Sequence, residues 1–195
     1  MKFKIIIFNF FFLSFLSCKN VNKVENTSIV DSKVIEDYDI IDLNLLKIEE
    51  KAYLFDKKET LLEIFGKPNE RVVVTQECAS FFHQEDSTNY FYYGNPKLKE
   101  DRTSFEMTFD SLALRHYNFR DSNKKLFYPN LELSKSTKLS DLKSIFPKSF
   151  KGQYGNDKKT NIIVVPLLTC KVCDDKIFLI FENELLIGLD YYMDC

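Results

Sequence analysis

The chain has 195 residues, a formal net charge of −2, and 15% aromatic residues, with 19 Phe, 10 Tyr and no Trp. Lysine and arginine do not cluster beyond pairs such as Lys57-Lys58 and Lys158-Lys159, which argues against a nucleic-acid-binding surface because such a surface needs a concentrated basic face. Only five Gly and five Pro accompany these aromatic residues, so the composition favours well-filled sheet faces over a glycine-rich binding loop.

The first 18 residues have the pattern of an export signal. Lys2 and Lys4 precede an apolar stretch over residues 5–16, which is too short for a membrane-spanning helix of about 20 residues. The next residues, Phe15-Leu16-Ser17-Cys18, resemble the bacterial lipobox, in which the cysteine receives diacylglycerol and becomes the first residue after cleavage. An ordinary secretory signal that ends at a cysteine is the alternative.

Lipidation at Cys18 would decide where the protein resides. Cleavage would leave 178 residues, and the net charge would fall from −2 to −4 because Lys2 and Lys4 are removed. The two or three acyl chains of such a lipoprotein anchor it firmly. We therefore predict a signal peptide at 1–17, a flexible polar tether at 18–39, and a location at the outer membrane facing the periplasm. The expected partners are the membrane and another protein, and no nucleic acid.

The folded part is predicted to begin near residue 40 with a helix and a run of strands. Asp56-Lys57-Lys58-Glu59 has the spacing of a capping box, and Leu61, Leu62 and Phe65 then fall on one helical face. Gly66-Lys67-Pro68 ends this helix. Strand-like runs follow at residues 71–75, 90–93, 104–109 and 112–119, with turn signals between them.

The same pattern recurs in the second half. Leu142-Lys143-Ser144-Ile145-Phe146 echoes Leu61-Leu62-Glu63-Ile64-Phe65 at an offset of 81, and strand-like runs follow at 162–168, 176–181 and 185–192. One such unit can barely bury a core, whereas two can share one. We predict an α+β fold of two related repeats, 40–130 and 131–195, each a short helix packed on a small antiparallel sheet. A coincidental recurrence of unrelated α+β hairpins is the alternative.

These motifs carry a resemblance to a known group. Phe65-Gly66-Lys67-Pro68, the strand at 90–93 and Phe109-Asp110-Ser111-Leu112 resemble the BamE/SmpA lipoproteins and the β-lactamase inhibitor protein fold, in which a short helix ends in a Gly-x-Pro turn before an antiparallel sheet. The second half departs from this pattern at Pro147 and Ser149. The resemblance covers most of residues 40–195. It implies a fold and a protein-binding role, in envelope assembly or in inhibition of a target.

The sequence contains no motif typical of an enzyme. Nucleophile elbows, phosphate loops and metalloprotease helices do not occur. His83 and His116 lack a partner at ligand spacing, and the alternation of Leu112, Leu114 and His116 indicates a partly buried strand residue. We therefore predict no catalytic residue, no cofactor and no bound metal.

Four cysteines follow Cys18, at positions 78, 170, 173 and 195. An even number in an exported protein favours disulfide bonds. If Phe181 faces Leu185 across a hairpin, Cys195 falls beside the segment 170–173. We therefore predict that Cys195 bonds to Cys170 or Cys173, and that Cys78 takes the remaining cysteine. A thiol redox role for Cys170-Lys171-Val172-Cys173, a zinc site that includes His83, and free thiols are the alternatives.

Aromatic residues at two places are the candidates for a protein-binding surface, since aromatic side chains anchor interfaces. They are Tyr90, Phe91, Tyr92, Tyr93, Tyr191 and Tyr192. Strand alternation sends about half of them into the core, and the sequence leaves open which half. An inhibitor or immunity lipoprotein that neutralises a toxin or an enzyme is the alternative function.

Overall fold

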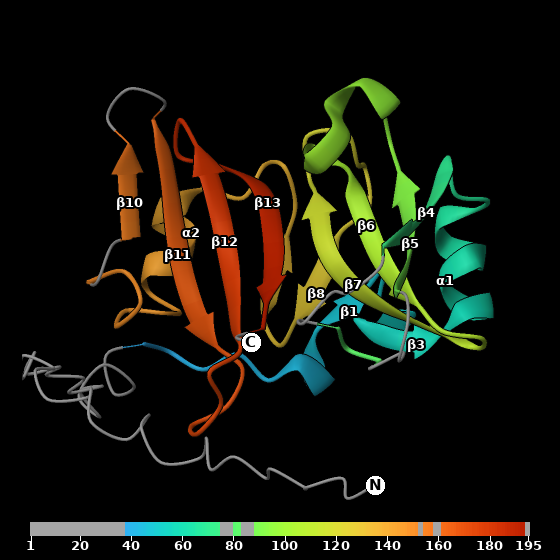
Figure 1. The fold of residues 1–195 in the computed structure, drawn as a ribbon. Coiled ribbons are helices and arrows are strands. Elements are labelled where there is room, and N and C mark those ends of the chain that lie inside the picture. Colours follow the sequence, from blue (N-terminus) through green and yellow to red (C-terminus); the bar gives the residue numbers. More distant parts are fainter. Residues whose placement is uncertain (1–37, 75–79, 83–87, 152–153, 158–160, 194–195) are drawn as a thin grey trace, which may run out of the picture. The chain divides into compact units, whose positions relative to one another are not determined.

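The chain folds as an α+β structure dominated by antiparallel strands, as predicted. The computed structural model describes residues 38–74, 80–82, 88–151, 154–157 and 161–193, which are coloured in Figure 1. Within these ranges the chain has two α-helices, two short 3-10 helices, and strands in two sheets.

Helix α1 (Lys58–Phe65) precedes the first run of strands. Its last residue places an aromatic ring against Tyr93 and Phe105, with ring centroids 5.2 and 5.0 Å apart. Gly66 ends the helix with a φ of 75°, in the left-handed region that glycine enters without a steric cost. The predicted helix and its end are therefore confirmed.

Each half of the large sheet is an antiparallel meander. After α1 come β4 (Glu70–Val74), β5 (Thr88–Tyr93), the 3-10 helix η3 (Pro96–Asp101), β6 (Thr103–Met107) and β7 (Ser111–Asn118). After helix α2 (Leu139–Lys143) come β10 (Tyr154–Asp157), β11 (Ile162–Leu168), β12 (Lys176–Glu182) and β13 (Leu185–Tyr192).

The two meanders join through their last strands into one sheet of order β10-β11-β12-β13-β7-β6-β5-β4. The seam between β13 and β7 is short, with three antiparallel residue pairs from Gly188↔Asn118 to Asp190↔His116. β3 (Phe55–Lys57) also pairs with β7, at its first residues. One continuous nine-stranded sheet therefore holds both halves.

A small four-stranded sheet and the N-terminal segment complete the described fold. The strand order of the small sheet is β2-β1-β8-β9. The bounds are β1 (Lys47–Ile48), β2 (Ala52–Tyr53), β8 (Leu126–Tyr128) and β9 (Leu131–Leu133), with the 3-10 helix η2 (Leu43–Leu45) before β1.

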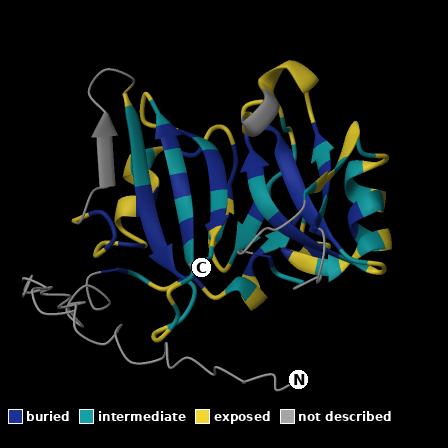
Figure 2. Cartoon of the chain, viewed as in Figure 1, coloured by how far each residue is buried: buried dark blue, intermediate teal, exposed yellow. Residues whose placement is uncertain are grey.

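Alternation along the strands gives the large sheet two faces. The inner face carries fully buried residues such as Leu114, Tyr117, Leu189 and Leu179, and these share one core with buried residues of both helices and of the small sheet. The outer face carries the intervening residues, and in β11, β12 and β13 several of these, such as Val164, Phe178 and Ile180, are only partly buried (Figure 2). The outer face therefore presents side chains that a ligand or a partner can contact.

Two helix predictions need correction. The Asp56 carboxylate does not cap α1. It lies in β3 and accepts from the Lys57 N–H at 2.6 Å and the Tyr53 N–H at 3.0 Å, and the N-cap Lys57 makes no side-chain cap bond. In the second half α2 ends at Lys143, so Phe146 lies in the following turn, where its N–H donates to Leu142 O at 2.9 Å.

Candidate functional site

The structure separates the six aromatic candidates. Tyr90, Phe91, Tyr93 and Tyr191 are buried, so these four candidates are not available as surface anchors. Tyr92 is partly exposed, and 45% of Tyr192 is exposed. Phe91 and Tyr93 belong to the core because they lie on the inner face. Tyr92 and Tyr192 remain as surface residues.

Tyr92 belongs to a row of side chains that crosses seven strands on the outer face. Each member is the register partner of the next, from β4 to β11: Glu70, Tyr92, Ser104, His116, Asp190, Phe178 and Pro166. The end at Tyr92 is charged, because Arg102 forms an ion pair with Glu70 at 2.5 Å and its guanidinium lies 4.4 Å from the Tyr92 ring centroid. The end at Phe178 is apolar.

In the first half, residues 80–82 contact the outer face through a buried carboxylate. Glu106 is fully buried in β6. It accepts hydrogen bonds from the Ser80 hydroxyl and from the N–H groups of Phe81 and Phe82, the latter two at 3.0 and 3.2 Å. The Phe81 ring packs edge-on against Phe55 at a centroid distance of 4.7 Å. Sequence reasoning missed this site, although an acidic residue in the middle of a predicted strand was a signal for it.

In the second half the outer face carries a cluster of partly exposed apolar side chains, which we call the outer patch. Its members are Val164, Phe178, Ile180 and Tyr192. Val164 and Ile180 are cross-strand partners, and the rings of Phe178 and Tyr192 lie 5.7 Å apart. Three adjacent strands thus present one apolar surface.

Polar groups border the outer patch on three sides. His116 Nδ1 pairs with the Asp190 carboxylate at the seam, and Arg120 Nη2 lies 2.9 Å from Glu182 Oε1 near the end of β12. Lys176, at the start of β12, occupies the third side. A partly exposed apolar centre with a polar border is the usual composition of a protein-binding surface.

Gly188 lies next to the pair of His116 and Asp190, and a Cβ there would make only ordinary van der Waals contacts. A Cβ at Gly188 would lie 3.5 Å from His116 Cε1 and 3.5 Å from Ile180 Cδ1. His116 is a partly buried strand residue, as predicted. Ser104 is its register partner, but the hydrogen bonds of the described residues include none between Ser104 and His116.

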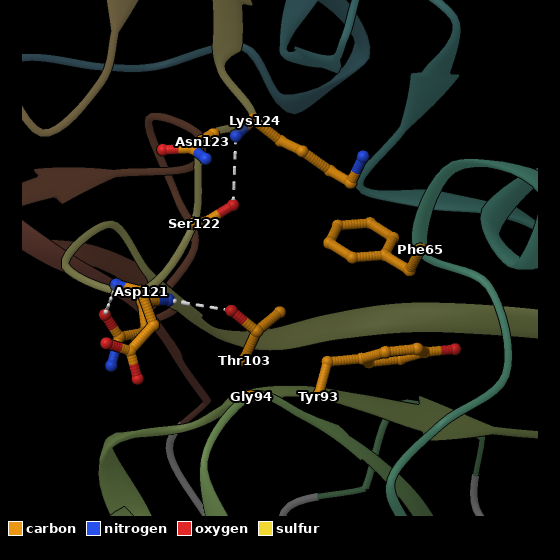
Figure 3. A pocket seen from close by; sticks show the side chains of 9 residues that line it. Phe65, Tyr93, Gly94, Thr103, Asp121, Ser122, Asn123 and Lys124 are labelled. Atoms are coloured by element: carbon orange, nitrogen blue, oxygen red, sulfur yellow. Dashed lines mark hydrogen bonds between the residues drawn. The ribbon is translucent and has the colours of Figure 1, made fainter.

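A pocket of about 290 Å³ lies between the end of α1 and the loop after β7 (Figure 3). Phe65 and Tyr93 form one wall, and the facing side is polar, with Thr103, Asn118, Asp121, Ser122, Asn123 and Lys124. Lys124 Nζ lies 5.8 Å from the Phe65 ring centroid. The backbone of this loop is fixed by hydrogen bonds, among them Lys124 N–H to Ser122 Oγ at 3.1 Å.

The tyrosines near this pocket are held in their neutral form. Burial raises the pKa of Tyr93 to about 12 and also raises the pKa of Tyr117. Tyr93 donates to Gly66 O at 3.3 Å, and Tyr117 donates to Lys124 O at 3.0 Å. Both hydroxyls therefore serve the structure as donors and do not act as bases at neutral pH.

The cysteines do not pair as predicted. Cys170 and Cys173 form a disulfide across the turn between β11 and β12, with Cα atoms 5.2 Å apart. This pairing contradicts a bond from Cys195 to either of them. The assumed register also fails, because the two-residue turn at Asn183 and Glu184 pairs Glu182 with Leu185 and so places Phe181 opposite Leu186. Cys78 and Cys195 lie outside the described residues.

Two further hypotheses from the sequence concern a zinc site that includes His83 and a lipid anchor at Cys18. His83 and Cys18 both lie outside the described residues. In the described part of the chain no group of three His, Cys, Asp or Glu side chains could hold a metal ion. No helix there is long and apolar enough to cross a membrane.

Comparison with known proteins identifies no family. No protein-family model, no curated protein and no solved structure matches the chain. The resemblance to BamE/SmpA lipoproteins therefore rests on sequence motifs alone, and function has to be argued from the outer face.

Proposed function

We propose that the chain is a lipid-anchored, non-catalytic protein of the cell envelope that binds another protein through the outer patch. The observation that carries this proposal is the group of partly exposed apolar side chains on three adjacent strands, in particular Phe178, Ile180 and Tyr192. Contiguous exposed apolar surface of this kind marks interaction sites.

The composition of the outer patch indicates the chemistry of the partner. Its aromatic rings are ordered by their own contact at 5.7 Å, so little conformational freedom is lost on binding. The border holds both signs of charge, in Lys176 and in the pair of Arg120 and Glu182. We infer a partner that presents apolar side chains at the centre of its contact and polar groups of both signs around them.

The location follows from the leader. Lys2, Lys4, the apolar residues 5–16 and Cys18 have the order of a lipoprotein signal. Lipidation would hold the protein at the outer membrane, facing the periplasm, within reach of envelope-assembly machinery.

A tandem-repeat origin is part of the proposal. Each half places a short helix before a four-strand meander, and each meander joins the other through its last strand. The proposed boundary between residues 130 and 131 falls in the turn between β8 and β9. The matching order of helix and strands, and not the position of this boundary, supports two related repeats at 40–130 and 131–195.

Site-specific cross-linking tests the binding function. A photo-reactive phenylalanine analogue at position 178 of the lipidated protein should give a defined adduct with one envelope protein, and Ile180→Asp should abolish it. The same analogue at Leu45, which is 46% exposed in η2, serves as the control. The same adducts from both positions, or none from position 178, would contradict the proposal.

A further inference from the structure

Two apolar side chains stand out as the most exposed in the described part of the chain. Phe109 is 96% exposed and Val172 is 88% exposed, whereas the next large apolar residue, Val73, is 55% exposed. Phe109 lies in the turn between β6 and β7, and Val172 lies in the turn between β11 and β12. Both therefore stand at the tips of hairpins of the large sheet.

The two turns lie at one edge of that sheet. β13 is antiparallel to both β12 and β7, so β12 and β7 run in the same direction (Figure 1). The turns that precede these two strands must then emerge at the same end of the strands. We call this end of the sheet the tip edge. The opposite edge carries the turn between β12 and β13, where Leu185 begins β13.

The described chain also starts at the tip edge. Ile41 N–H donates to Leu168 O at 2.9 Å, and Leu168 N–H donates to Asp39 O at 3.0 Å. Leu168 is the last residue of β11, directly before the turn that carries Val172. The first described residues, 38–41, therefore lie at the edge that carries both exposed side chains.

Both turns are held by local bonds. In the first, Thr108 N–H donates to Ser111 O at 2.9 Å, and Lys58 N–H donates to Asp110 O at 2.8 Å. The second is closed by the disulfide between Cys170 and Cys173. Phe109 and Val172 are thus presented on ordered supports, which lowers the entropy cost of inserting them into another phase.

The surroundings of these side chains favour a lipid surface over a protein partner. Phe109 and Val172 are single side chains on separate turns, so they do not form the contiguous patch that a protein interface needs. Charges of both signs flank them, Lys171 and Asp174 beside Val172 and Asp110 beside Phe109. Attraction to anionic headgroups is therefore not the driving force. A bilayer accepts apolar side chains that project from separate turns at one end of a protein. A lipid anchor keeps the bilayer at high effective concentration beside these side chains.

We propose that Phe109 and Val172 insert into the headgroup and acyl boundary of the membrane that holds the lipid anchor, so that the protein rests on its tip edge. This inference rests on the proposed lipidation of Cys18. It places the outer patch on a sheet that rises from the membrane, where a partner can reach it.

Single-tryptophan fluorescence tests the contact, because the chain contains no Trp. Phe109→Trp, Val172→Trp and the control Leu185→Trp are each prepared in the lipidated protein and bound to vesicles of phosphatidylcholine and phosphatidylglycerol. The first two should emit at shorter wavelength on vesicles, and brominated acyl chains should quench them several-fold more strongly than the control.

Flotation of the same vesicles separates the two proposals. Protein that floats, with all three tryptophans quenched equally or not at all, would overturn the tip-edge contact and leave the anchor intact. Protein that does not float would overturn both the anchor and the contact that depends on it.

Discussion

Replacement of Glu106 should release residues 80–82 from the outer face. This fully buried carboxylate accepts the N–H groups of Phe81 and Phe82 at 3.0 and 3.2 Å. A hydrogen bond to a charged group contributes about 1.5–3 kcal/mol, so loss of both costs about 3–6 kcal/mol. Amide exchange at Phe81 and Phe82 in Glu106→Ala should therefore accelerate by about 10²–10⁴-fold, up to the limit set by global unfolding. Native-state hydrogen exchange measures this directly.

Glu132→Gln is the matched control for this experiment. Glu132 is paired with Lys125 at 2.8 Å, but both side chains are exposed, so its replacement should cost less than about 1 kcal/mol. It should leave the exchange of Phe81 and Phe82 unchanged. If Glu106→Ala also left their protection unchanged, the packing of Phe81 against Phe55 would hold the segment, and the reasoning from the carboxylate would be refuted.

Four further results are expected. Cys18→Ser should abolish acyl labelling of the protein, and retained label would contradict the anchor. Phe146→Ala should lower the free energy of unfolding by about 3–5 kcal/mol in urea titrations, because the ring is almost fully buried. Stability should fall as the pH rises from about 10 to about 12, because the unfolded chain loses the Tyr93 proton first while burial holds its folded pKa at about 12; Tyr93→Phe should make this decline shallower. Peptide mapping without reduction should recover Cys170 linked to Cys173, and a peptide that links either of them to another cysteine would contradict the structure.

Local patterns predicted the long elements of the fold. The apolar spacing of Leu61, Leu62 and Phe65, with Gly66 after it, located α1, and strand-like runs located the strands of both meanders except β10, which was not predicted. The strands of the small sheet have only two or three residues, which is too short for a periodic signal. The pairing of β7 with β13 was equally out of reach, because no local preference encodes the partner of a strand.

The candidate site was harder to predict for the same reason. Alternation correctly implied that some of the tyrosines are buried, but it could not show that Tyr90, on the outer face, is buried as well. The predicted capping box failed because Asp56 had a nearer use in the turn before α1. The predicted disulfide pairing failed because Cys170 and Cys173, three residues apart, bond to each other across the turn between β11 and β12, and strand register does not reveal such a local pairing.

The short seam between β7 and β13 sets an order on folding. It joins residues as far apart as His116 and Asp190, a separation of 74 positions, so its formation carries a large loop-closure cost and comes late. β13 is also the last strand of the described chain. A chain that is still being synthesised therefore has β7 without this neighbour, and an unpaired strand edge invites aggregation.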